Sequence, residues 1–166
     1  MNQHLLIAVA LSLALAALPG EAQEPPVVRD EGPERPLIYT PADLEWRDGP
    51  ASLEPGAQFV VLEGDFGEPG FFTMQIRMPD GFLIAPHWHP AVERVTVISG
   101  TFSLGHGDVV DRAAAQRLPA GSHFSLPREM RHFAFTEGET IIQLSSIGPW
   151  EIHYVNPADD PRTRGQ

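Results

Sequence analysis

The sequence feature that most constrains the fold is the segment His87-Trp88-His89-Pro90-Ala91-Val92-Glu93. Side chains on a β-strand alternate between its two faces, so His87 and His89 would point the same way and Trp88 the opposite way. Pro90 lacks the N–H that a sheet ladder requires and favours a turn, after which we expect a returning strand that begins at Glu93. The segment therefore predicts two imidazoles and a carboxylate close together, which is a large part of a metal site.

From Gln58 onward, short runs rich in β-branched and aromatic residues alternate with turn signals, and no segment has a convincing helical period. The expected strands are residues 59–62, 71–78, 82–86, 94–98, 101–104, 123–126, 131–135, 140–144 and 150–155. Turns rich in Gly, Pro and Asp separate them, including Ser99-Gly100 and Glu137-Gly138-Glu139. This alternation of short strands and turns predicts an all-β sandwich or barrel.

The alternation of side chains also predicts which residues line the interior. If Glu93 faces inward, so does Val95, and if His132 faces inward, Phe133 and Phe135 face away. We therefore expect a largely apolar interior. Because outward aromatic rings are rarely left in water, we also expect a Pro-rich arm or a second subunit to cover the outer face.

The first 22 residues have the composition of a cleavable secretory signal. Residues 5–18 are apolar throughout, and the Pro19-Gly20-Glu21-Ala22 segment places small residues where a signal peptidase reads them. We predict cleavage after Ala22 and a periplasmic or secreted protein without a membrane anchor. The first residues contain no Lys or Arg, so a retained N-terminal anchor is the alternative.

The rest of the chain divides by composition into three parts. Residues 23–57 contain seven prolines and are predicted to form an extended arm, with disorder at its beginning. Residues 58–156 are predicted to form a single barrel domain, and residues 157–166 an extended polar tail. We expect the arm to contact the outside of the barrel or a partner subunit, in a homodimer.

Charge and composition exclude several classes of function. The formal net charge of −11 makes nucleic acid and anionic membranes poor partners. All eleven basic residues are Arg, which excludes lysine Schiff-base chemistry, and the absence of Cys excludes thiol nucleophiles and Cys-ligated zinc.

The spacing around the opening segment resembles the first motif of the cupin family. Five residues separate Gly81 from His87, one separates His87 from His89, three separate His89 from Glu93, and six separate Glu93 from Gly100. The resemblance implies a double-stranded β-helix, the jelly-roll barrel of the cupins.

A second segment resembles the second cupin motif, although it departs from it twice. Gly121 is followed after five residues by Pro127, and His132 lies five residues further on. Glu129 stands where the family motif has Gly, and Thr136 stands where it has Asn. The predicted ligand, His132, is unaffected by either departure.

The resemblance implies that one divalent metal ion binds inside the barrel, and its expected ligands are His87, His89, Glu93 and His132. Three imidazoles and one carboxylate suit transition metals, with Fe²⁺ or Mn²⁺ favoured and Ni²⁺, Co²⁺ or Zn²⁺ compatible. Two histidines on one strand face need no function by themselves, and some cupins use their metal only structurally. We expect the remaining mature histidines, His106, His123 and His153, to lie outside the site.

The function implied by this resemblance is that of a metal-dependent enzyme acting on a small organic molecule. A dioxygenase-type oxidoreductase is the first expectation, and isomerase or lyase chemistry uses the same ligands. Glu93 would also serve as the catalytic base if the reaction moves a proton. No inward Arg is evident, which favours a neutral or phenolic substrate. The alternative is a non-catalytic periplasmic module that binds or senses a small ligand around a structural metal.

Overall fold

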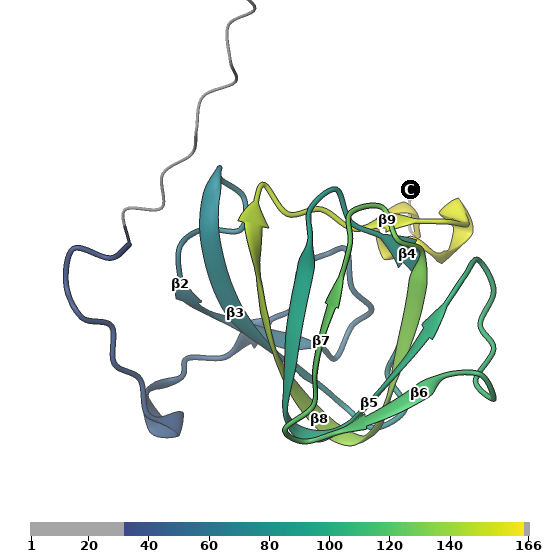
Figure 1. Ribbon diagram of the computed structural model, residues 1–166, viewed down its shortest axis with the longest axis horizontal. Helices are drawn as coiled ribbons and strands as arrows, with labels where there is room; N and C mark the ends of the chain where they lie inside the picture. Colours follow the sequence, from purple (N-terminus) through teal and green to yellow (C-terminus); the bar gives the residue numbers. More distant parts are fainter. Residues whose placement is uncertain (1–31, 165–166) are drawn as a thin grey trace, which may run out of the picture.

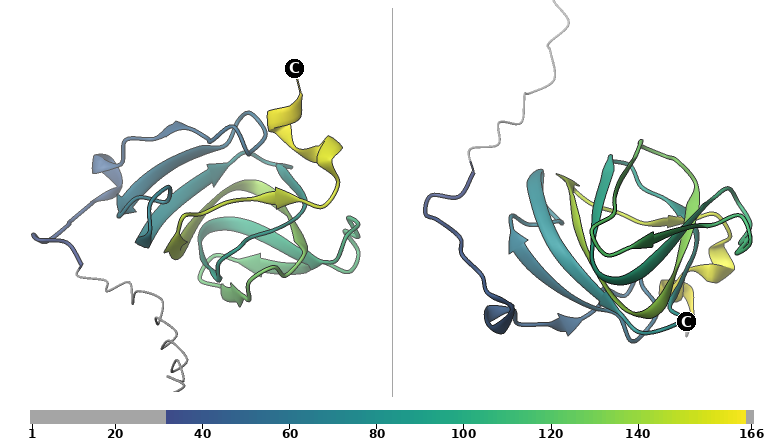
Figure 2. Two further views of the ribbon diagram at one scale, coloured as in Figure 1. Left: turned by 90° about the horizontal axis from the view of Figure 1, so that it is seen from above. Right: turned by 60° about the horizontal axis from the view of Figure 1, so that its bottom comes forward.

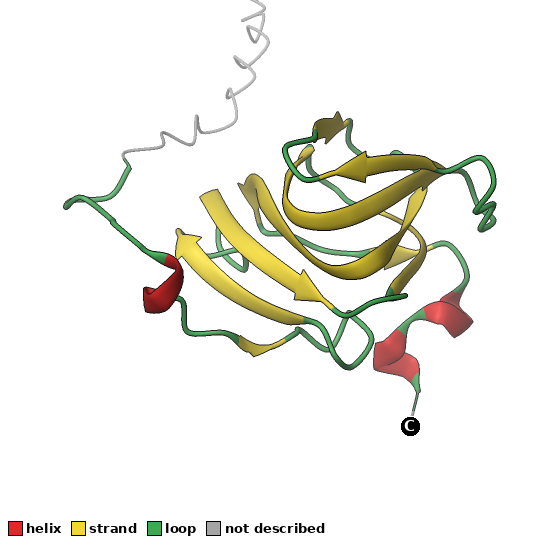
Figure 3. Cartoon of the chain, turned by 90° about the horizontal axis from the view of Figure 1, so that it is seen from below, coloured by secondary structure: helices red, strands yellow, loops and turns green. Residues whose placement is uncertain are grey.

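The computed structural model describes residues 32–164, and most of its regular structure is β-strand (Figure 3). The strands are β1 (Arg47–Asp48), β2 (Gln58–Glu63), β3 (Gly70–Met78), β4 (Leu83–Trp88), β5 (Glu93–His106), β6 (Gln116–Pro119), β7 (His123–Leu126), β8 (His132–Gly148) and β9 (His153–Tyr154). Three short 3-10 helices accompany them: η1 (Pro41–Asp43), η2 (Pro157–Asp159) and η3 (Pro161–Thr163). The predicted all-β class is confirmed.

The predicted signal peptide lies outside the described residues, so it stays a prediction. Within residues 32–164, no helix has the length and apolar character that a membrane crossing requires.

Two long strands hold the barrel together. β5 and β8 pair antiparallel along almost their whole length, from Arg94 opposite Ser145 to His106 opposite His132. One half of β8 also pairs with β3, and the other half with β4. β5 pairs in addition with β6 and β7, so the strands wrap around a common interior (Figures 1 and 2). This is the double-stranded β-helix that the cupin resemblance implied.

Two of the expected turns are irregularities within these long strands. The chain continues through Ser99-Gly100 as a single strand, and the β5–β8 register shifts on both sides of Ser99. Gly100 has φ +77°, and a Cβ atom there would lie 2.8 Å from the Cα of Thr140 and collide with the carbonyl of Glu139. Glycine is therefore required for the two strands to bend together at this point. The Glu137-Gly138-Glu139 turn is likewise absorbed into β8.

The core follows the predicted alternation of side chains. Alternate residues of β3, β5 and β8 are buried, among them Met74, Val95 and Leu144. Gln143 lies between two buried neighbours on the other face of β8. These inward side chains surround a largely apolar interior, as the sequence predicted.

The expectation that an arm or a second subunit covers the outward aromatics is wrong for β8. Phe133 and Phe135 are only 1% and 7% exposed in the single chain. Gly105 on β5 leaves room for the ring of Phe133, and the guanidinium of Arg112 lies 4.2 Å from the ring of Phe135. Phe133 thus packs against β5 itself, and the β5–β6 connection covers Phe135.

The arm is partly docked and partly exposed. Its β1 pairs with β2, and Arg77 on β3 places its guanidinium 4.0 Å from the ring of Trp46. By contrast, Ile38 is 82% exposed. The end of the arm returns over the barrel, where the hydroxyl of Tyr154 donates to the carbonyl of Ser52 at 2.7 Å. The boundary at residue 57 stays a prediction.

The C-terminal segment is not extended as expected. Asn156 and Asp160 cap the helices η2 and η3 by accepting backbone N–H groups of Ala158 and Arg162. An ion pair between Arg164 and Glu54 then joins this segment to the end of the arm. The C-terminal segment and the end of the arm therefore meet beside β9.

Candidate metal centre

Three buried histidines converge inside the barrel at the end where β4 and β8 lie side by side. His87 lies on β4 directly opposite His132 at the start of β8, and His89 lies just beyond the end of β4. Their ring nitrogens all lie within 4.8 Å of one another, and the residues are 3%, 3% and 6% exposed. Three buried histidines at this spacing can hold a metal ion.

Backbone carbonyls fix the tautomer of each imidazole. The Nδ1 atoms of His87, His89 and His132 lie 2.7, 2.7 and 2.9 Å from the carbonyl oxygens of Ala85, Glu151 and Met130. A carbonyl oxygen can only accept a hydrogen bond, so each Nδ1 carries the proton. In the neutral imidazoles, the Nε2 atoms are then unprotonated and free to donate their lone pairs to a metal.

Burial keeps two of these imidazoles neutral. Burial, together with the neighbouring His132 and His89, lowers the pKa of His87 well below its usual value of 6.5. Burial also lowers the pKa of His89 to about 4, although the nearby Glu93 carboxylate opposes the shift. At neutral pH both rings are therefore in the form that binds metal.

Glu93 brings a carboxylate to the same place. Its Oε2 lies 3.2 Å from Nε2 of His132 and 4.0 Å from Nε2 of His89. Burial alone would raise the pKa of Glu93, but the contact with His132 and the proximity of His89 outweigh burial, so its pKa lies below the usual value. That lowering holds only when Nε2 of His132 carries a proton. In the neutral ring, whose proton is held at Nδ1, the 3.2 Å approach places a lone pair against a carboxylate.

The Oε2 atom of Glu93 is consequently buried with no hydrogen-bond partner. Buried polar atoms are nearly always paired, and a buried carboxylate oxygen facing imidazole lone pairs is repelled by them unless a cation lies between. The donor set therefore fits a divalent metal ion. The structure brings together all four residues that the sequence singled out.

The two departures in the second motif have local explanations. Glu129 adopts φ 62°, the only positive φ among the described non-glycine residues, and its N–H donates to the carbonyl of His89 at 2.8 Å. This conformation explains why glycine suits the position. Thr136 donates its hydroxyl to the carbonyl of Pro79 at 2.6 Å and accepts the N–H of Phe82 at 2.9 Å. Its side chain thereby joins β8 to the turn before β4.

Several supporting residues could not be recognised from the sequence. The indole of Trp150 stacks on the ring of His89, with centroids 4.0 Å apart and planes 19° apart. Ser146 donates its hydroxyl to the carbonyl of Val92 at 2.7 Å and so fixes the turn before Glu93. No local spacing signals these contacts, because the partners are more than fifty residues apart.

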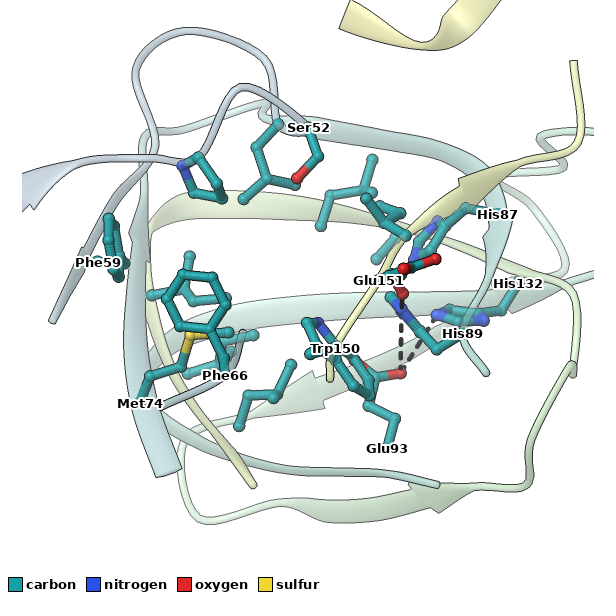
Figure 4. A pocket seen from close by; sticks show the side chains of 18 of the residues that line it. Ser52, Phe59, Phe66, Met74, His87, His89, Glu93, His132, Trp150 and Glu151 are labelled. Carbon is teal, nitrogen blue, oxygen red and sulfur yellow. Dashed lines mark hydrogen bonds and ion pairs between the residues drawn. The ribbon is translucent and has the colours of Figure 1, made fainter. Parts of the chain in front are cut away.

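A cavity of about 140 Å³ extends from the histidines into the barrel (Figure 4). Its walls are mainly apolar and include Phe59, Phe66, Met74, Phe102, Phe124, Ile142, Leu144 and Trp150. Pro50, Ser52 and Leu53 from the arm also line it, as does Arg162 from η3. The expectation that no Arg faces the interior is therefore wrong, because Arg162 follows the last strand and reaches the cavity from η3.

The other histidines within residues 32–164 lie outside the cluster. His106 is exposed at the end of β5, and His123 is exposed with its Nδ1 3.0 Å from the hydroxyl of Thr96. His153 stacks on Trp88 at 4.2 Å and pairs with Glu151 at 2.9 Å.

Comparisons with known proteins agree with this architecture. The profile of the ChrR cupin-like domain family matches residues 34–150. Germin-like protein 9-3 of Oryza sativa subsp. japonica is 30% identical over 102 residues, which cover 57% of this chain and 48% of that protein. Germin-like protein 3-1 of the same plant is 34% identical over 87 residues, which cover 52% of this chain and 35% of that protein. The chain thus spans half or less of these relatives.

Solved structures show the same fold at low identity. The polyketide cyclase RemF from Streptomyces resistomycificus matches 75% of this chain and 89% of its own, with a TM-score of 0.59 and 17% identity. An RmlC-like cupin from Shewanella frigidimarina NCIMB 400 matches 69% of this chain and 94% of its own, with a TM-score of 0.54 and 19% identity. At these identities, the likeness concerns the fold alone.

Proposed function

Since the chain belongs to the ChrR cupin-like family within the cupin superfamily, we propose that it is an exported, metal-dependent enzyme acting on a small organic molecule. One observation carries this proposal. Three imidazole lone pairs and an unpartnered carboxylate oxygen converge at the end of an apolar cavity. A purely structural histidine cluster would need neither the cavity nor the orphaned oxygen.

The proposed ligands are His87, His89, Glu93 and His132. Three nitrogen donors and one oxygen donor suit a divalent transition metal, and hard, all-oxygen sites for Mg²⁺ or Ca²⁺ are a poor match. Fe²⁺ and Mn²⁺ are favoured, while Ni²⁺, Co²⁺ and Zn²⁺ can use the same ligands. Selection among them would depend on the metal available where the protein folds.

A bound metal would supply Lewis acidity and, as Fe²⁺ or Mn²⁺, one-electron chemistry with dioxygen. The chain's own residues provide the rest of the site. The apolar walls exclude water from the reacting group and hold the substrate beside the four donors. If the reaction moves a proton, Glu93 would detach from the metal, and its carboxylate would accept that proton from the substrate. These features serve a dioxygenase-type reaction and equally an isomerase or lyase reaction.

The first test is elemental analysis of the full chain purified from its own compartment, with mass spectrometry of co-purified small molecules. We expect one transition-metal ion per chain. A protein that takes up no metal from Fe²⁺, Mn²⁺ or Co²⁺ solutions would overturn the site. The proposed dioxygenase activity is then tested by measuring oxygen consumption and product formation. The metal-loaded protein is incubated with a panel of small organic molecules.

Export is tested separately. The mature protein recovered from the periplasm or the medium should begin at Gln23, as determined by N-terminal sequencing. Intact Met1 in protein that stays in the cytoplasm would contradict the proposed export without affecting the metal site.

A non-catalytic ligand-binding module is the second candidate, and one observation favours it. The arm forms part of the cavity through Pro50, Ser52 and Leu53, so ligand binding and arm position are physically linked. Such a module would retain its ligand without turnover. Release of the compound unchanged after incubation with metal and dioxygen would support this candidate over the enzyme.

A further inference from the structure

The cavity beside the four donors has a size and lining that restrict what can bind there. Its volume of about 140 Å³ is close to that of an apolar protein cavity of about 150 Å³ that binds benzene. A single six-membered ring therefore fills it. Two fused rings would require the walls to move.

The walls are arranged to contact an aromatic ring. Phe59, Phe66 and Trp150 line the cavity, and the buried Phe72 connects them into an edge-to-face series. The ring centroids of Phe59 and Phe66 are 5.8 Å apart, those of Phe66 and Phe72 6.3 Å, and those of Phe72 and Trp150 5.9 Å. Trp150 then stacks on His89, so the series ends at the donor cluster. Figure 4 shows Phe66 and Met74 on the side of the cavity away from His87 and His132. An aromatic ligand lying against Phe59, Phe66 and Trp150 would gain ring contacts with them.

Polar groups for a second recognition point are scarce among the described lining residues. The guanidinium of Arg162 is engaged by the carboxylate of Asp160 at 2.8 Å and by the carbonyl of Ile152 at 2.9 Å. Outside the four donors, the other polar lining residues are Ser52, whose carbonyl accepts from Tyr154, and Glu151, which pairs with His153. The far wall, made by Phe59, Phe66 and Met74, offers no polar side chain. A polar group placed against it would lose its hydrogen bonds to water without replacement.

From this geometry we infer that the site selects monocyclic aromatic compounds that carry one oxygen-donor head group and no polar group at the opposite end of the ring. The inference rests on the proposed metal site, because the head group is recognised there by the metal. Ring burial supplies the remaining affinity, and the cavity wall sets the upper limit of size.

The test uses the full chain loaded with Co²⁺, whose visible absorption reports on its ligands, and a series of carboxylates with one constant head group. Benzoate should bind at least about tenfold more tightly than acetate, because only benzoate buries a ring. Terephthalate and 2-naphthoate should each bind at least about tenfold more weakly than benzoate, because one carries a second charge and the other is too long.

A matched pair of variants locates the binding in the cavity. Ile142 lines the cavity, and the neighbouring Ile141 lies on the opposite face of β8. Ile142→Phe should weaken benzoate binding at least about tenfold by filling the cavity, whereas Ile141→Phe should leave it within about twofold. Bound Co²⁺ and the circular dichroism spectrum report whether each variant is folded. If Ile142→Phe does not fold, the carboxylate series on the unmodified chain decides.

The outcomes separate the two proposals. A chain that binds no Co²⁺ overturns the metal site and this inference with it. A chain that binds Co²⁺ but takes acetate as tightly as benzoate, or 2-naphthoate as tightly as benzoate, leaves the metal site standing and overturns the aromatic selectivity.

Discussion

The two segments that supply the donors are built differently. The first motif, Gly81–Gly100, places three donors within seven residues and agrees with the cupin pattern at each motif position. The second motif, Gly121–Thr136, supplies one donor and departs from the pattern at Glu129 and Thr136. In both motifs, the donor positions carry the residue types that metal binding requires. The two positions that differ from the cupin motif serve backbone geometry, and other residues can serve it at some cost in stability.

The largest effect expected concerns the single donor of the second motif. Loss of an outer-shell partner alone weakens metal binding about 10- to 100-fold, so His132→Ala, which removes a ligand, should weaken it at least about hundredfold. The control is His106→Ala, because His106 faces His132 across the β5–β8 ladder but is exposed. Titration with Co²⁺ or Mn²⁺ measures the metal affinity of both variants. If His132→Ala still binds one ion per chain tightly, the three donors of the first motif are sufficient for metal binding.

The second prediction concerns the backbone of the first motif. Gly100→Ala should lower the free energy of unfolding by about 3 kcal/mol or more, because the added Cβ collides with β8 in addition to the cost of positive φ. Gly107→Ala is the control, since Gly107 also has positive φ but nothing lies within 4 Å of the added atom. It should lose about 1 kcal/mol. Urea unfolding of the metal-free protein measures the free energy of unfolding of both variants. Equal decreases would show that the close approach of Gly100 to β8 does not contribute to stability.

The third prediction tests whether Thr136 replaces the expected Asn through its hydrogen bonds. Thr136→Val keeps the shape but leaves the N–H of Phe82 and the carbonyl of Pro79 without this partner, which should cost about 2 kcal/mol. Thr136→Asn can both donate and accept, so its loss should be smaller. The same unfolding measurement applies. If the valine variant is as stable as the original, the two motifs are joined by packing rather than by this hydroxyl.

The smallest effect has the opposite sign. Glu129→Gly should raise the free energy of unfolding by about 1 kcal/mol, because glycine adopts φ 62° without strain. Arg128→Gly, at an exposed neighbouring position without positive φ, should lower it by about 0.5 kcal/mol through added freedom of the unfolded chain. A loss of stability in Glu129→Gly would indicate that the glutamate side chain has a role of its own.

The sequence was most informative where contacts are short in range or follow strand alternation. His87 and His89 could be placed on one face by parity, and the burial of Val95 followed from its spacing to Glu93. The strand start at Glu93 was also predictable from Pro90. Local rules of this kind extend over a few residues, which is the scale of a strand and its turn.

The remaining features depend on distant contacts that no local pattern records. The stacking of Trp150 on His89 and the approach of Arg162 to the cavity require the whole barrel to be closed. Continuous strands through Gly100 and Gly138 were read as turns, because glycine at a bulge and glycine at a turn look alike in sequence. The covering of Phe135 by Arg112 was missed because the intervening loop has no regular period.

The hydrogen bond from His89 to the carbonyl of Glu151 spans 62 residues and has a consequence for how the site is assembled. Until the segment around Glu151 has folded, nothing holds the His89 ring in its metal-binding tautomer and orientation. A chain that folds from its N-terminus can therefore bring together three of the four donors early and still lack a preorganised site. Metal acquisition would be among the last events of folding, and a tightly bound ion would mark molecules whose barrel is complete.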